Sequence, residues 1–197
     1  ERDLALLALL TSKNDSLTNK YFKQTANLDL TGNFWLPIGS IETYFQGHYD
    51  GNGYKIENIS TFDNKNLPLS YVGLFGYVKN SLIENVNIIS GSVKRTENVG
   101  ALTGSAYGGS IKTCRNGAAV IGIQNCGFIG SAVGTKVMSC ANYGDISAAS
   151  FAGGIIGFNY IDAALVEGCL SRCNIVCAQK SGGIIGEAVI EGTKIIA

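Results

Sequence analysis

The side chains best suited to chemistry in this sequence are six cysteines, a single histidine and a scatter of carboxylates. Thiolates and imidazoles bind metals or act as nucleophile and base, and two carboxylates about 5–10 Å apart can cleave a glycosidic bond. The cysteines are Cys114, Cys126, Cys140, Cys169, Cys173 and Cys177. They form no Cys-x-x-Cys pair, the spacing from which zinc sites usually take their ligands. We therefore expect no metal site and no cofactor.

The histidine, His48, stands between Gly47 and Tyr49, opposite in alternation to the apolar positions of its segment. We therefore expect it to face solvent. No nucleophile motif such as G-x-S-x-G accompanies it, which argues against a catalytic role. The next residues, Asp50-Gly51-Asn52-Gly53, begin like a calcium loop, but Glu57 comes too early to supply the bidentate ligand. Asp-Gly and Asn-Gly pairs readily adopt positive φ angles, so a tight turn is predicted there.

The enzymatic alternative rests on carboxylates of the last repeats, which are Asp145, Asp162, Glu167, Glu187 and Glu191. Asp162 and Glu167 lie in one segment, and Asp145 could approach them from the adjacent turn. Such a pair would suit a polysaccharide lyase or a glycoside hydrolase. Scattered solvated acids are the simpler interpretation. We predict that the chain is not an enzyme, name no catalytic, cofactor-binding or metal-binding residue, and leave its binding residues unknown.

The composition excludes several classes of protein. Charged residues make up 15% of the chain, against about 25% in soluble domains, while 26 glycines and only two prolines suggest many tight corners. Fifteen basic and fifteen acidic residues balance, which gives no electrostatic case for nucleic acid. No apolar run approaches the roughly 18–20 residues that span a bilayer, so no membrane span is expected in this segment.

An apolar pair followed by glycine recurs along the chain, and its five copies are Leu74-Phe75-Gly76, Leu102-Thr103-Gly104, Phe128-Ile129-Gly130, Ile155-Ile156-Gly157 and Ile184-Ile185-Gly186. The closing glycines are 28, 26, 27 and 29 residues apart. A second marker keeps step 10 to 12 residues later, at Val86, Cys114, Cys140 and Cys169. A third, looser marker is a β-branched residue at Val93, Val120, Ile146 and Ile175. Each repeat of about 27 residues thus contains three short apolar segments.

These segments are too short and too β-branched for helical repeats, and a propeller would need four antiparallel strands per blade. They predict an all-β fold, a three-sided parallel β-helix (solenoid), right-handed by analogy with most such helices. The repeated markers would then stack into inward rows. The cysteines of the second marker are expected as buried free thiols, with disulfides as the alternative in a secreted chain.

We predict one β-solenoid domain over residues 1–197. Residues 4–12 read as a helix within an N-terminal helical cap over 1–20, and alternation over 22–30 predicts a half-exposed strand. Atypical first turns follow over 21–71, and the repeats fill 72–197. After Gly186 the chain covers about one strand of a new turn, so we expect either a short covering tail or a native protein that continues.

The segment Val72-Gly73-Leu74-Phe75-Gly76 resembles the GLUG motif, a repeat of bacterial surface proteins. The preceding residues 21–30, Trp35-Leu36-Pro37-Ile38-Gly39 and 45–53 resemble the lead-in that these proteins carry, so the resemblance covers about residues 21–197. Only the first repeat has the full motif; Ala101 and Thr103 depart from it in the second. The resemblance implies a secreted or cell-surface protein, of the kind described as adhesins. Such modules also accompany immunoglobulin-cleaving peptidases as non-catalytic regions.

The function expected from the sequence is that of a non-catalytic cell-surface or secreted repeat module. It would act as an adhesin or scaffold that presents a surface to an unidentified glycan or host protein, or to further domains of the same polypeptide. Two alternatives stay open: a polysaccharide lyase or glycoside hydrolase built on a β-helix, and the non-catalytic stalk of a larger surface peptidase.

Overall fold

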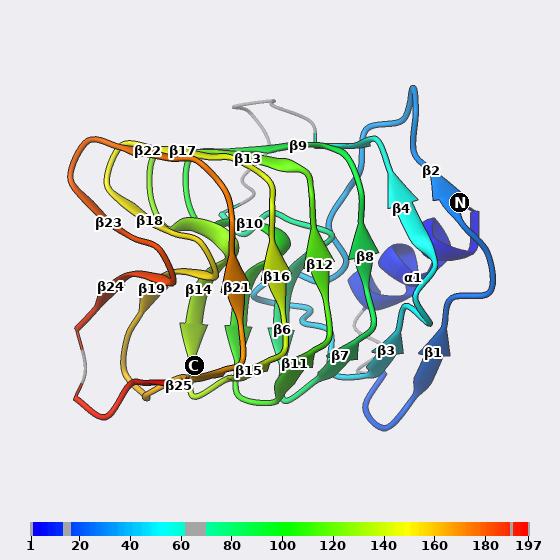
Figure 1. Cartoon of the computed structure of the whole chain (residues 1–197). Helices are drawn as coiled ribbons and strands as arrows, with labels where there is room; N and C mark the ends of the chain where they lie inside the picture. The colour runs from blue at the N-terminus through cyan, green and yellow to red at the C-terminus, as the bar shows by residue number, and fades with distance from the viewer. Residues whose placement is uncertain (1, 14–16, 62–69, 190, 197) are drawn as a thin grey trace.

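The computed structural model describes residues 2–13, 17–61, 70–189 and 191–196. One helix, α1 (Arg2–Ser12), precedes about six turns of parallel strands that stack into a solenoid (Figure 1). This confirms the predicted parallel β-helix with a short N-terminal helix. The expected cap over 1–20 and first turns over 21–71 include residues 14–16 and 62–69, which lie outside the described residues.

The strands form four ladders that run along the solenoid. The first ladder contains, in stacking order, β1 (Tyr21–Lys23), β3 (His48–Asp50), β7 (Leu82–Glu84), β11 (Ser110–Lys112), β15 (Lys136–Met138), β20 (Leu165–Glu167) and β25 (Lys194–Ile196). The second contains β2 (Leu28–Asp29), β4 (Lys55–Glu57), β8 (Asn87–Ile88), β12 (Arg115–Asn116), β16 (Ala141–Asn142) and β21 (Leu170–Ser171).

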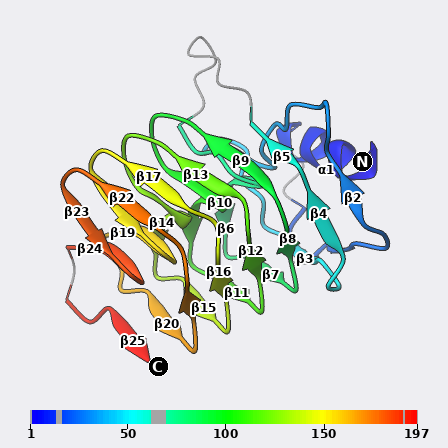
Figure 2. The ribbon, with the colours of Figure 1, turned by 45° about the horizontal axis from the view of Figure 1, so that its top comes forward.

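The other two ladders complete each turn. The third contains β5 (Ile59–Ser60), β9 (Gly91–Lys94), β13 (Ala119–Ile121), β17 (Ile146–Ala148) and β22 (Ile175–Cys177). The fourth contains β6 (Phe75–Lys79), β10 (Val99–Tyr107), β14 (Cys126–Val133), β18 (Phe151–Gly153), β19 (Ile156–Asn159), β23 (Lys180–Gly182) and β24 (Ile185–Ala188). Every strand pairs in parallel with the strand one turn away, as Figure 2 shows along the stack.

A left-handed residue separates the first ladder from the second in each regular turn. Thr113 and Ser139 occupy this corner with φ angles of 52° and 53°, and Asn85 has 55°. Such a residue bends the chain within one or two residues, so one apolar segment of the repeat contributes to two short ladders.

The repeat markers take the inward places predicted for them. Leu74, Leu102, Phe128 and Ile155 are fully buried, whereas Ile184 in the last described turn is only partly buried. The closing glycines are required by the stacking: a Cβ on Gly130 would lie 2.5 Å from the carbonyl oxygen of Gly104. Neighbouring backbones therefore approach too closely for any other residue, which explains the periodic glycine.

Helix α1 lies at the N-terminal end of the stack, opposite β23 to β25, in both ribbon views. It begins two residues before the predicted 4–12, and Leu4 and Leu7 pack into the core. This end of the core is covered, as a solenoid requires.

The single strand predicted over residues 22–30 was wrong. The chain forms β1 and β2 instead, in different ladders, with a corner between them. The buried side chain of Gln24 makes this corner, since its Nε2 atom donates to the carbonyl oxygens of Ala26 at 2.8 Å and Lys55 at 3.2 Å. The turn predicted at residues 50–53 is confirmed, with positive φ angles at Asn52 and Gly53.

Candidate functional site

A cavity of about 740 Å³ opens between α1, the loop of residues 34–43 and the chain around Tyr71. We call it the N-terminal groove. The loop is held in place because Ile38 and Phe45 make parallel bridges to Phe75 and Val78 of β6, which extends the fourth ladder beyond its regular strands. The volume of the groove falls in the range of about 300–1,000 Å³ that is usual for ligand sites.

The walls of the groove expose an unusual amount of apolar surface. Leu9 of α1 is 50% exposed, and Leu36 and Ile41 of the loop are 56% and 52% exposed. Phe34 at the same edge is also largely exposed. Large apolar side chains that gather around one depression mark a site of interaction more often than chance.

The aromatic floor of the groove is fixed in position. Trp35 is buried, and its indole N–H donates to the carbonyl oxygen of Leu74 at 2.9 Å. Tyr71 packs edge-to-face against Tyr77, with 5.2 Å between the ring centroids. Both rings are therefore set in place before any ligand arrives.

Two carboxylates, Glu42 and Glu97, lie at the border of the groove. Glu42 belongs to the loop and Glu97 to the turn between β9 and β10, so elements far apart in sequence contribute one carboxylate each to the lining. Burial raises the pKa of Tyr71, and the nearby charge of Glu97 adds to this rise. None of the described residues that line the groove is basic.

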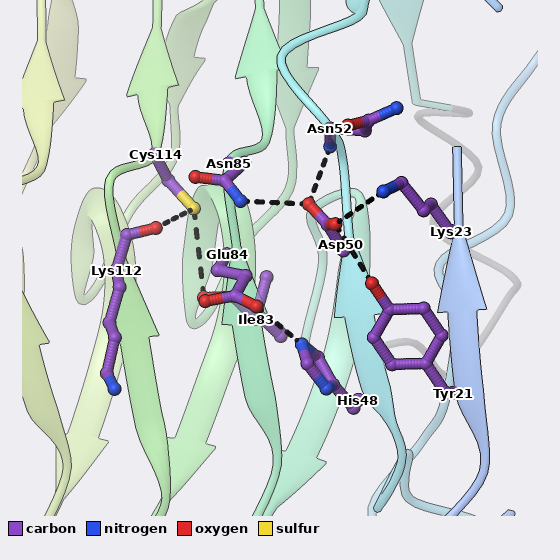
Figure 3. A network of polar contacts seen from close by, with 10 residues as sticks. All are labelled: Tyr21, Lys23, His48, Asp50, Asn52, Ile83, Glu84, Asn85, Lys112 and Cys114. Carbon is purple, nitrogen blue, oxygen red and sulfur yellow. Dashed lines mark hydrogen bonds and ion pairs between the residues drawn. The ribbon is translucent and has the colours of Figure 1, made fainter. Parts of the chain in front are cut away.

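A second group of polar side chains lies on the outer surface of β1, β3 and β7 (Figure 3). Asp50 is its centre: Oδ1 accepts from Asn85 Nδ2 at 2.9 Å and from the backbone N–H of Asn52 at 2.7 Å. Its Oδ2 atom accepts from the Tyr21 hydroxyl at 3.0 Å and lies 3.7 Å from Lys23 Nζ. Both carboxylate oxygens are thus occupied by neighbours from three successive turns.

Asp50 is held as an anion at neutral pH. Burial acts to raise its pKa, but the hydrogen bonds from Asn85, Asn52 and Tyr21 and the charge of Lys23 outweigh burial and hold the pKa below its usual value. The hydrogen bond to Asp50 also raises the pKa of Tyr21. Tyr21 therefore remains a donor and Asp50 an acceptor, which suits a stabilising contact between turns better than proton transfer.

His48 faces outward as predicted, but it is half-buried and not free. Its Nε2 atom lies 2.7 Å from Oε1 of Glu84 on the next turn, and its ring packs edge-to-face against Tyr21 (Figure 3). The sequence contained no signal for the partner, because the chain between β3 and β7 is longer than the repeat.

The structure places the carboxylates proposed for the enzymatic alternative on separate corners and strands. Asp145 lies at the corner between β16 and β17, where its Oδ1 accepts from the backbone N–H of Asn174 at 2.9 Å. Asp162 lies at a different corner, between β19 and β20, and Glu167 ends β20. Glu187 of β24 pairs with Lys180 at 2.9 Å, and Glu191 lies after β24.

The second marker forms the inward row that was predicted, with Val86, Cys114 and Cys140 buried and Cys169 half-buried. All six cysteines have free thiols. Burial raises the pKa of Cys126 to about 12, so its thiol is protonated at neutral pH. The residues that the structure describes contain no group of three or more histidine, cysteine or acidic side chains that could hold a metal.

Comparisons with known proteins give one sequence relative and one solved structure with a similar fold, and the chain spans only part of each. No protein-family model matches the chain. A segment of 89 residues, 43% of the chain, is 42% identical to a protein of Evansella cellulosilytica provisionally named a Gly-rich membrane protein, and the match spans only 10% of that protein. The crystal structure of a protein from Bacteroides ovatus, provisionally named an immunoglobulin A1 protease, matches with a TM-score of 0.63 at 21% identity, over 90% of this chain and 67% of that one. This likeness shows the fold.

None of the described helices is long and apolar enough to cross a membrane.

Proposed function

We propose that this chain is a non-catalytic recognition module of a larger cell-surface or secreted protein, and that it binds an extracellular macromolecule through the N-terminal groove. The observation that carries the proposal is the groove itself, in which exposed Leu36 and Ile41 stand over the fixed ring of Trp35. A rigid scaffold with an irregular end is a common arrangement for recognition, since loops carry the contacts and the scaffold positions them.

Placement outside the cell is supported by the relatives. The Gly-rich protein that shares 42% identity over its matched segment is named as a membrane protein, and the chain spans a tenth of its length. The Val72–Gly76 segment, with its resemblance to the GLUG repeat, supports an adhesin-like role in the same direction. A β-helix also forms part of the structure named as an immunoglobulin A1 protease, which keeps the non-catalytic stalk of a surface peptidase as a related form of the proposal.

Carbohydrate cleavage is the second candidate, and one pairing between neighbouring strands favours it. Asp50 and Glu84 are register partners on adjacent strands of the first ladder, so two carboxylates lie on neighbouring turns. The occupied oxygens of Asp50 argue against a catalytic role for the pair. Release of reducing sugars or unsaturated products that Glu84→Gln abolishes would establish this candidate instead.

The proposal is tested by binding of the purified chain to arrays of glycans and extracellular matrix proteins. The exposed positions Leu36 and Ile41 are changed together to serine, and Val176→Ser, which alters a 68% exposed residue in β22, is the matched control. We expect binding that falls at least ten-fold in the double variant and is unchanged in the control. The absence of binding on both arrays, or binding that the double variant retains, would contradict a recognition role for the groove.

A further inference from the structure

The N-terminal groove combines an apolar wall with negative charge, and this combination restricts what it can bind. Glu42 and Glu97 are both exposed at its border, and the described lining residues include no lysine, arginine or histidine. A ligand with a positive charge is therefore favoured over a neutral or acidic one. The two glutamates attract a cation and repel a ligand that carries a carboxylate of its own.

The aromatic floor favours a cation in the same way. Both rings line the groove and are held by the contacts to Leu74 and Tyr77; Trp35 is only 6% exposed, and the half-buried Tyr71 is the more accessible of the two. An ammonium or guanidinium group within about 6 Å of an aromatic ring is attracted by the negative face of that ring. The carboxylates and the rings thus select the same kind of group.

The rest of the lining suits apolar side chains better than sugar hydroxyls. Two hydroxyl groups of the loop, those of Ser40 and Thr43, lie 3.0 Å apart and hydrogen-bond to each other, and Ser40 also accepts from the backbone N–H of Thr43 at 3.1 Å. Leu9, Leu36 and Ile41 form the exposed surface beside them. A bound glycan would leave many of its hydroxyl groups against this apolar wall without partners.

We propose that the N-terminal groove binds a protein segment in which a lysine or arginine side chain is flanked by apolar residues. This inference rests on the proposed function and names the ligand class of the same site. The cation lies between the carboxylates of Glu42 and Glu97 and the aromatic floor, and the apolar neighbours cover Leu36 and Ile41.

The chain offers a built-in reporter for the test. Trp35 is its single tryptophan and lines the groove, so its fluorescence reports occupancy directly. The probes are three pools of short peptides with blocked termini, in which Leu, Phe or Val flank a central position. That position is lysine in the first pool, norleucine in the second and glutamate in the third.

We expect saturable binding of the lysine pool at least ten-fold tighter than that of the glutamate pool. The difference should shrink in about 1 M salt, where the screening length falls to roughly 3 Å. The double variant Glu42→Gln with Glu97→Gln keeps the side-chain shapes and should reduce lysine-pool affinity three- to ten-fold. Glu167→Gln in β20, far from the groove, is the matched control and should leave the affinity unchanged.

Equal binding of the three pools, or an unchanged affinity in the double glutamine variant, would overturn the inference. If the array binding described above is lost in the Leu36 and Ile41 variant while the peptides fail this test, the recognition function stands and the ligand class is wrong. Glycan binding lost in that same variant would overturn the inference in favour of carbohydrate. If neither arrays nor peptides show groove-dependent binding, both the function and the inference fail.

Discussion

The Nδ2 atom of Asn116 lies 2.7 Å from Oδ1 of Asn142, one turn further along the solenoid and inside its core. Asn142 in turn donates to the carbonyl oxygen of Gly154 at 2.8 Å and accepts from the backbone N–H of Gly144 at 3.2 Å. The two amides therefore satisfy backbone groups at a corner where the strands stop pairing. Among the described residues, every buried side-chain nitrogen and oxygen has a partner, which these asparagines help to achieve.

Asn142→Ala should lower the free energy of unfolding by at least about 2 kcal/mol, because it leaves buried polar groups of Gly144 and Gly154 without partners. Urea unfolding followed by circular dichroism measures the change. The control is Asn174→Ala at an exposed position, expected within about 0.5 kcal/mol of the unmodified chain. An Asn142 variant as stable as that control would show that the amide row contributes nothing.

Gly130→Ala should destabilise the fold by about 1–3 kcal/mol, the usual cost of overpacking. The added methyl group would meet the carbonyl oxygen of Gly104, which belongs to a strand and cannot move away easily. Gly183→Ala is the comparison, since an added Cβ there has no atom within 4 Å. Thermal unfolding of both variants measures the effect, and equal midpoints would contradict the steric explanation for the repeated glycine.

Asp50 should make stability depend on acid pH. Its pKa in the folded chain lies below the value of about 3.9 for a free aspartate, so the unfolded chain binds the proton first as the pH falls. Its contribution is complete above about pH 4 and is lost below it. Asp50→Asn should therefore destabilise the chain at pH 7, and the difference from the unmodified chain should narrow toward pH 3.

Urea titrations at several pH values measure this dependence. The control, Asp162→Asn, changes an exposed carboxylate and should stay within about 0.5 kcal/mol of the unmodified chain at pH 7. A difference between Asp50→Asn and the unmodified chain that stays constant from pH 7 to pH 3 would contradict the prediction.

The thiols of Cys114, Cys126 and Cys140 should resist alkylation in the folded chain. Burial excludes the reagent, and the raised pKa of Cys126 keeps its thiol protonated. Iodoacetamide at pH 8 should modify the half-buried Cys173 and Cys177 first, and all six only in denaturant. Peptide mapping by mass spectrometry gives the order, and equal rates at Cys140 in the folded and unfolded chain would be inconsistent with this structure.

The regular part of the fold could be predicted from sequence because equivalent positions in successive turns have the same packing environment. Val86, Cys114 and Cys140 occupy the same place in successive turns, so each copy reinforced the others, and the structure buries all three. The same holds for Leu74 and Phe128. Because the same packing requirement recurs in every turn, the sequence repeats the same type of residue at a regular spacing that can be recognised.

The N-terminal groove could not be found in this way. Glu42 comes from the irregular loop of residues 34–43 and Glu97 from the turn between β9 and β10, and only the folded chain brings both to the lining of one cavity. His48 was predicted to face outward, but its partner Glu84 lies 36 residues away, well beyond the repeat. Sequence periodicity cannot predict which residues pair on neighbouring strands where the spacing departs from the repeat.

The pairing of each turn with its immediate neighbours alone has a mechanical consequence. The backbone hydrogen bonds between turns lie along the long axis, so a load applied along that axis is carried by one rung after another. In single-molecule stretching the solenoid should unfold one turn at a time. Each step should release one repeat of about 27 residues, roughly 90 Å of extended chain. Under tension along its axis, the solenoid would lengthen gradually instead of rupturing at once.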